Sequence, residues 1–88
     1  MKVRFLNSFL QDLDLISDQK EKEAILKVID TCEKAKFLSQ LASLKKLPGF
    51  KNVFRIKDKN YRIGLYIEIN ELVFARISHK AELYKMFP

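Results

Sequence analysis

Residues 53–79 read VFRIKDKNYRIGLYIEINELVFARISH, and apolar side chains alternate with polar ones through most of this segment. A period of two is typical of strands that bury one face. Polar residues suited to turns interrupt the pattern at Asp58-Lys59-Asn60 and at Asn70-Glu71. We therefore predict an antiparallel meander of three strands, at residues 53–57, 61–69 and 72–78.

The alternation also predicts which side chains share a face of this sheet. One face is apolar, and the third strand contributes Val73, Ala75 and Ile77 to it. The opposite face carries four cations: Arg55, Lys57, Arg62 and Arg76. A structural alternative is that these cations do no more than solvate an exposed sheet face. Arg76 can also pair with Glu68 on the neighbouring strand.

Upstream of the strands, the apolar spacing is that of helices. Residues 6–16 place apolar side chains at i, i+3, i+4, i+7 and i+10, which is one face of an amphipathic helix. Asp18 with Glu21 three residues later matches a capping box and predicts the start of a second helix. Cys32 lies on the apolar stripe of that helix, so we expect a buried small hydrophobe. The short junction predicts that the two helices form a hairpin.

Three further segments complete the predicted fold. Residues 2–6 can form a first strand, residues 37–47 a helical turn or coil, and residues 80–87 a short final helix. The predicted fold class is α+β, in which an N-terminal helical hairpin packs on a small antiparallel β-sheet and a short C-terminal helix follows. At 88 residues, the chain is long enough for a single domain, residues 1–88.

Composition narrows the classes of function. One cysteine allows no internal disulfide, and one cysteine with one histidine is too few ligands for a zinc site. We predict no metal and no cofactor. No apolar run approaches the ~20 residues that a membrane span needs, so we expect a cytoplasmic protein without a membrane partner.

Charge is distributed unevenly along the chain. Residues 1–44 hold seven Lys/Arg and seven Asp/Glu, whereas residues 45–88 hold ten Lys/Arg and four Asp/Glu. The net charge of +6 therefore lies entirely in the half that contains the predicted strands. A compact domain with one basic part favours a polyanionic partner, of which nucleic acid is the commonest.

Four short motifs follow one another in this basic half: Leu47-Pro48-Gly49, Phe54-Arg55-Ile56, Tyr61-Arg62-Ile63, and Ile77-Ser78-His79-Lys80 with Tyr84 after it. In order and spacing they resemble the RelE/ParE superfamily of small toxins from bacterial toxin–antitoxin systems. The resemblance implies the α+β fold described above. It also implies one of two activities, because many members cut mRNA in the ribosomal A site and others inhibit DNA gyrase. Most members are held inactive by an antitoxin encoded beside them.

Carried over by position, the resemblance implies these catalytic residues: Arg55, Lys57, Arg62, His79 (or Lys80 in its place) and Tyr84. A wider set is implied for nucleic-acid binding: Lys51, Arg55, Lys57, Lys59, Arg62, Arg76, Lys80 and Lys85. Lys80 departs from the family pattern, in which Arg is frequent. Arginine forms a bidentate fork on phosphate, whereas lysine acts as a point charge, so clamping of the transition state from this position is in question.

The chemistry of RNA cleavage without a metal gives each residue a candidate role. Arg62 and Arg55 would hold the scissile phosphate. Lys57 is a candidate base, because neighbouring cations disfavour the charged form of an amine. His79 is a candidate acid or base, and Tyr84 could stack on a nucleobase. The competing interpretation is structural: His79 only ends a strand, and Tyr84 packs as part of the last helix.

Three functional hypotheses follow. The leading one is a ribosome-dependent, metal-independent mRNA endoribonuclease that inhibits translation, with mRNA, the ribosomal A site and a cognate antitoxin as partners. The antitoxin is expected to be acidic and to dock through an amphipathic helix. The alternatives are a gyrase inhibitor of the same fold without nuclease activity, and a decayed toxin that only binds antitoxin or RNA.

Overall fold

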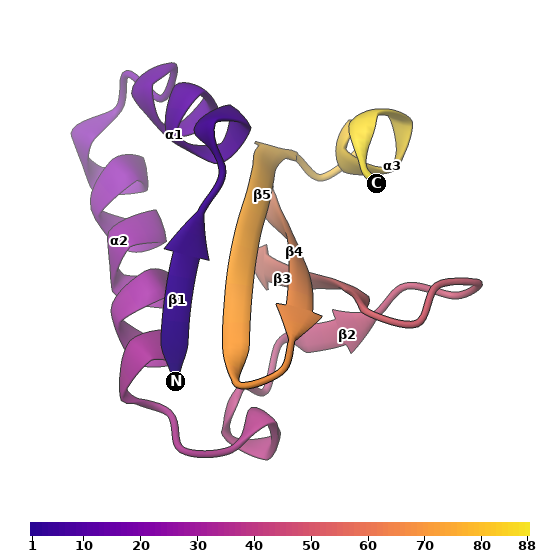
Figure 1. Cartoon of the computed structure of the whole chain (residues 1–88). Helices are drawn as coiled ribbons and strands as arrows, with labels where there is room; N and C mark the ends of the chain where they lie inside the picture. Colours follow the sequence, from indigo (N-terminus) through magenta and orange to yellow (C-terminus); the bar gives the residue numbers. More distant parts are fainter.

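A five-stranded sheet, covered by helices on both faces, forms the centre of the molecule (Figure 1). The computed structural model describes all of residues 1–88. Its elements are β1 (Lys2–Phe5), α1 (Asn7–Asp14), α2 (Gln19–Lys34), a 3-10 turn (Leu38–Gln40), β2 (Leu44–Lys46), β3 (Val53–Asp58), β4 (Tyr61–Glu68), β5 (Glu71–His79) and α3 (Leu83–Met86). None of these helices has the length and apolarity that crossing a membrane requires.

The strand order is β1-β5-β4-β3-β2, and β3, β4 and β5 form the predicted antiparallel meander. Two strands extend it. β1 pairs with β5 in parallel, so the sheet is mixed rather than wholly antiparallel. β2 pairs with β3 at the other edge and lies inside the segment predicted as turn or coil. The α+β class, the helical hairpin and the short final helix are confirmed.

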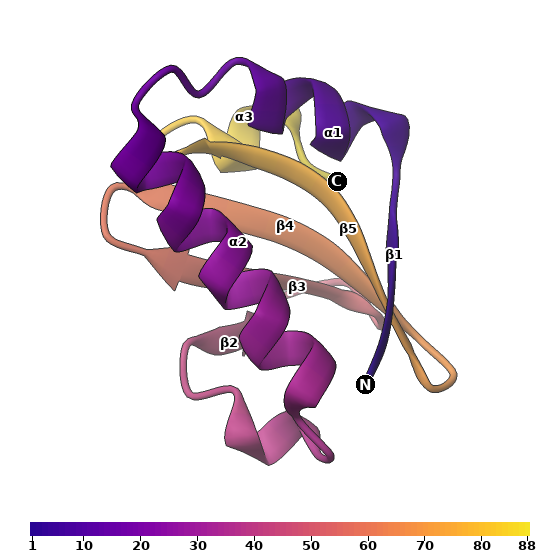
Figure 2. The same cartoon turned by 90° about the vertical axis from the view of Figure 1, so that its left-hand side faces the viewer.

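The helices lie on opposite sides of the sheet. Figure 2 shows α2 across one face and α3 behind the sheet on the other, while α1 lies along the C-terminal half of β5. We call the face turned toward α2 the helix face and the opposite one the outer face. Asp18 caps α2 as predicted, because its carboxylate accepts the backbone N–H groups of Lys20 and Glu21 at 2.8 and 3.1 Å.

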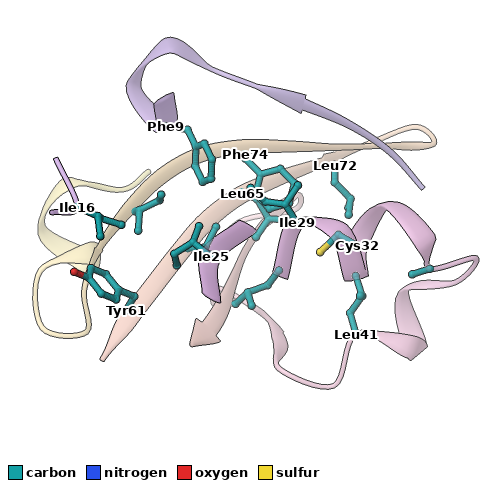
Figure 3. Packing of buried hydrophobic residues seen from close by; sticks show 14 residues of the cluster. Phe9, Ile16, Ile25, Ile29, Cys32, Leu41, Tyr61, Leu65, Leu72 and Phe74 are labelled. Atoms are coloured by element: carbon teal, nitrogen blue, oxygen red, sulfur yellow. The ribbon is translucent and has the colours of Figure 1, made fainter. Parts of the chain in front are cut away.

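The main core fills the space between the helices and the helix face (Figure 3). The rings of Phe5, Phe9 and Phe74 pack together with centroid separations of 5.4–5.6 Å, which ties β1, α1 and β5 to one another. Cys32 is buried in the same core, as predicted, and burial raises the pKa of its thiol to about 11.

A β-bulge in β5 overturns one prediction. Gly64 pairs with Arg76 but Leu65 pairs with Phe74, so Ala75 is an extra residue without a partner. Phe74 and Ile77 therefore lie in the main core, whereas Ala75 belongs to the cluster under α3. The predicted common face of Val73, Ala75 and Ile77 is wrong, because one inserted residue shifts the alternation by one position.

The outer face has a second, smaller core beneath α3. It contains five buried side chains: Leu47, Val53, Ala75, Leu83 and Phe87. Gly64 lies directly under Phe87, and a Cβ added to this glycine would stand 2.6 Å from the ring. Glycine at this position lets α3 seat closely on the centre of the sheet.

Candidate nucleic-acid interface

The cations of the outer face lie in two rows that run across the strands. In the first row Lys57 stands opposite Arg62, which stands opposite Ser78. In the second, Lys45 stands opposite Arg55, whose partner on β4 is Gly64. Directly opposite residues share a face, with Cβ atoms about 4.5–5.5 Å apart. The register therefore brings Arg55, Lys57 and Arg62 together beside α3.

The Arg62 side chain is held by the turn that precedes β4. Its Nη1 atom donates to the carbonyl oxygens of Lys59 and Tyr61, each at 2.8 Å. A guanidinium has five N–H donors, so donors remain for an anion. Arg55 is held in the same manner, by a 3.3 Å bond from Nη1 to the Ser43 carbonyl. The ion pairs of the structure involve other residues, so no carboxylate neutralises either arginine.

Arg76 differs from these cations because α1 neutralises it. Its Nε and Nη2 atoms donate to the two carboxylate oxygens of Asp12, at 2.7 and 3.1 Å. The hydrogen bond to Asp12 raises the pKa of Arg76. The same carboxylate accepts the backbone N–H of Ile77 at 2.9 Å, so Asp12 also fixes the bulge. The alternative pairing of Arg76 with Glu68 is wrong; the Glu68 carboxylate lies 3.5 Å from the Asn52 amide instead.

His79 lies apart from the cations of the outer face. It stands opposite Tyr61 at the end of β5, and the two rings stack at 4.8 Å with 24° between their planes. Tyr61 belongs to the main core, and its hydroxyl donates to the Glu21 carboxylate at 3.2 Å. The imidazole is therefore on the helix-face side of the sheet, whereas Arg62 is on the outer face.

Comparison with known proteins establishes the family. No family model matches the sequence. Over 89 aligned residues, covering all of both chains, the sequence is 34% identical to the toxin RelE3 of Methanocaldococcus jannaschii. The chain belongs to the RelE family of toxins. The resemblance found in the sequence motifs is thereby confirmed.

Solved RelE structures share the fold of this chain. The chain resembles the toxin of the RelB–RelE antitoxin–toxin complex from Methanococcus jannaschii, with a TM-score of 0.79, 29% identity, and coverage of 97% of this chain and 99% of the other. It also resembles the RelBE2 complex of Mycobacterium tuberculosis, with a TM-score of 0.71, 20% identity, and coverage of 90% and 96%. The isolated RelE toxin of E. coli shares the fold at a TM-score of 0.64 and 14% identity, with coverage of 96% and 90%.

The remaining predicted site residues of this RelE-family chain lie in turns, in a loop and on α3. Lys59 is exposed in the turn between β3 and β4, where its φ is +53°. Lys80 follows β5, and its N–H donates to the Asn60 carbonyl at 2.8 Å. Tyr84 and Lys85 lie on α3, and Lys51 lies in the loop between β2 and β3; all three are exposed.

The sequence predictions for the site omitted Lys45 and Phe50, which the structure places beside predicted site residues, and Lys46 next to Lys45. Lys45 and Lys46 are on β2, and Lys45 extends the row of Arg55. Phe50 is 47% exposed and lines a surface groove with Tyr84. A three-residue edge strand has too few positions to show alternation, so the pattern gave no signal for Lys45.

The Tyr61 hydroxyl provides a pH-dependent contribution to stability. Burial, and then the hydrogen bond to Glu21, raises the pKa of Tyr61 above its ordinary value. Because the pKa of Tyr61 is raised in the folded state, this stabilisation is fully present below the unfolded-state pKa of about 10. It is lost as the pH rises from there through the folded-state pKa. We expect the unfolding free energy of the wild type, relative to Tyr61→Phe, to be constant up to about pH 9 and to fall above about pH 10.

Urea unfolding at a series of pH values measures this difference. The comparison cancels the pH dependence that comes from all other groups, because these are the same in both proteins. A difference that does not change with pH would show that the Tyr61–Glu21 bond is absent in solution.

Proposed function

We propose that this RelE-family toxin cuts mRNA on the ribosome, with Arg55, Lys57 and Arg62 of the outer face as the centre of the site. The observation that carries the proposal is the register that places these three cations together without a carboxylate partner. A row of unpaired cations on a sheet face concentrates positive potential where an RNA backbone can lie. No finding favours the gyrase alternative.

The cleavage step requires a base, a clamp and an acid. In its deprotonated form, which this step requires, Lys57 takes the proton of the 2′-OH, and the 2′-oxygen attacks the adjacent phosphorus. Arg62 and Arg55 stabilise the charge that develops on the two non-bridging oxygens. The bond from phosphorus to the 5′-oxygen breaks, and an acid returns a proton to that oxygen. The products are a 2′,3′-cyclic phosphate and a 5′-OH.

We infer that Lys80 rather than His79 supplies that returning proton. Ser78 stands opposite Arg62, and Lys80 follows it by two residues, in the turn just after β5. His79 stacks on Tyr61 on the other side of the sheet. We expect Lys80→Ala to slow cleavage by about 100-fold, the lower end of the range for a positioned acid. His79→Ala should slow it by less than about 10-fold.

Single-turnover cleavage of ribosome-bound mRNA by the two variants measures this difference. His79→Gln, which keeps a polar planar side chain, controls for damage to the stacking on Tyr61. If His79→Ala is the slower variant, the acid is the histidine and the substrate passes around the end of β5.

We also propose a cognate antitoxin as the partner that silences the toxin. The similar structures from Methanococcus jannaschii and Mycobacterium tuberculosis are antitoxin–toxin complexes. An acidic, amphipathic antitoxin helix would complement the charge of the outer face, or it would displace α3. Displacement is feasible because α3 packs on the sheet through a cluster of only five buried residues. Mixing the toxin with the product of the neighbouring gene should give a stable complex with no free toxin activity. Absence of a complex would remove this partner.

The nuclease proposal is tested with purified protein and a labelled mRNA. We expect cuts when programmed ribosomes are present and none on free mRNA. A gyrase supercoiling assay in parallel should show no inhibition. If folded protein inhibits gyrase and leaves ribosome-bound mRNA intact, the nuclease proposal is wrong.

A further inference from the structure

A groove lies between α3 and the loop that joins β2 to β3. Both segments are on the outer side of the sheet, and Figure 1 shows the loop projecting beside α3. The groove has a volume of about 470 Å³, and Phe50, Tyr84 and Lys85 are among its lining residues. Gly49, with φ at +86°, turns the loop just before Phe50.

The lining of the groove combines buried apolar residues with exposed aromatic ones. Leu47 and Phe87 line it and are buried, at 8% and 4% exposure, so they hold the loop and α3 on the sheet. Phe50 and Tyr84 line it too but are 47% and 56% exposed. Two exposed aromatic side chains on a rigid support have free ring faces, and an unpaired nucleobase stacks on such faces.

The charge around the groove complements a nucleic-acid backbone. Lys46 and Lys51 line a second hollow on the loop, which also includes Phe50. Neither hollow is lined by an Asp or Glu side chain. Lys85 stands 3.6 Å from Glu82, but both side chains are exposed, and such a pair is easily exchanged for phosphate.

We propose that this groove binds an unpaired nucleobase of single-stranded RNA, with Phe50 as a stacking wall and Lys51 and Lys85 holding the flanking phosphates. The inference rests on the proposed function and deepens it, because it adds a base-binding site on the loop to the cations of the sheet. It also explains why an apolar ring stays exposed beside Lys51 in this loop.

A binding measurement separates stacking from charge. The probes are a labelled 2′-O-methyl oligoadenylate hexamer, which cannot be cut through its 2′-oxygen, and an abasic hexamer with the same phosphates. We expect Phe50→Ala to weaken binding of the oligoadenylate by about 5- to 150-fold. Binding of the abasic hexamer should not change. Phe50→Tyr should restore the wild-type affinity, and Phe37→Ala, at another exposed aromatic, should have no effect.

Two results overturn the inference. In the first, Phe50→Ala binds the oligoadenylate as tightly as Phe37→Ala does. In the second, Phe50→Ala weakens both hexamers equally, which would indicate a change in the loop rather than lost stacking. If Phe50→Ala weakens only the complex with the antitoxin, the groove takes a protein side chain instead. Cleavage by the wild type is measured separately, so failure of the nuclease proposal is distinguished from failure of the groove.

Discussion

Replacement of Arg62 with alanine is expected to slow single-turnover cleavage of ribosome-bound mRNA by about 10²- to 10³-fold. This range is typical for the loss of one preorganised donor that stabilises transition-state charge. Arg62 is such a donor, because two carbonyl bonds of 2.8 Å fix its guanidinium while other N–H groups remain available. Arg62→Lys should recover only part of the rate, since an ammonium lacks the planar fork.

Arg4→Ala is the matched control for Arg62→Ala. Arg4 is also an arginine on a strand, but it lies on β1, is exposed and pairs with Glu71 at 2.9 Å. This control should cut mRNA within about twofold of the wild type, because exposed ion pairs contribute little. Equal rates for Arg62→Ala and Arg4→Ala would remove Arg62 from the site.

Asp12→Ala is expected to lower the free energy of unfolding by about 2–4 kcal/mol. The substitution leaves the Arg76 guanidinium and the Ile77 N–H without their acceptor at a partly buried position. The Asp12 side chain is only 11% exposed, so water replaces the lost carboxylate poorly. Because Asp12 connects α1 to the bulge, the variant should also loosen the end of β5 that leads to Lys80.

Urea unfolding compares this variant with Asp14→Ala. Asp14 lies on the same helix but is exposed, and it makes no side-chain bond or ion pair. Its replacement should change the unfolding free energy by less than about 0.5 kcal/mol. If the two variants unfold at the same urea concentration, the Asp12–Arg76 contact does not hold the fold together.

Features set by local patterns were predicted from the sequence. The strands β3 and β4 follow a period of two with polar turns, and Asp18 marks the start of α2 by its capping chemistry. The same alternation placed Arg55, Lys57 and Arg62 on one face, and the register confirms that they are neighbours.

Features set by distant contacts were not predicted. The bulge at Ala75 ends a run of four consecutive apolar residues, 72–75, which suit either face, and it is held by Asp12 from α1. His79 is kept apart from Arg62 by its pairing with Tyr61 and by the stacking of the two rings. The parallel pairing of β1 and the edge strand β2 likewise depend on partners far along the chain, which no local period encodes.

The ends of the cleaved RNA test the central claim most directly. Ribosome-bound mRNA, labelled on either side of the cut, is treated with the wild-type protein and its new termini are identified. Attack by the 2′-oxygen in a site formed by Arg55, Lys57 and Arg62 predicts a 2′,3′-cyclic phosphate upstream and a 5′-OH downstream, with both products lost in Arg62→Ala. A 3′-OH with a 5′-phosphate, or cuts that persist unchanged in Arg62→Ala, would contradict it.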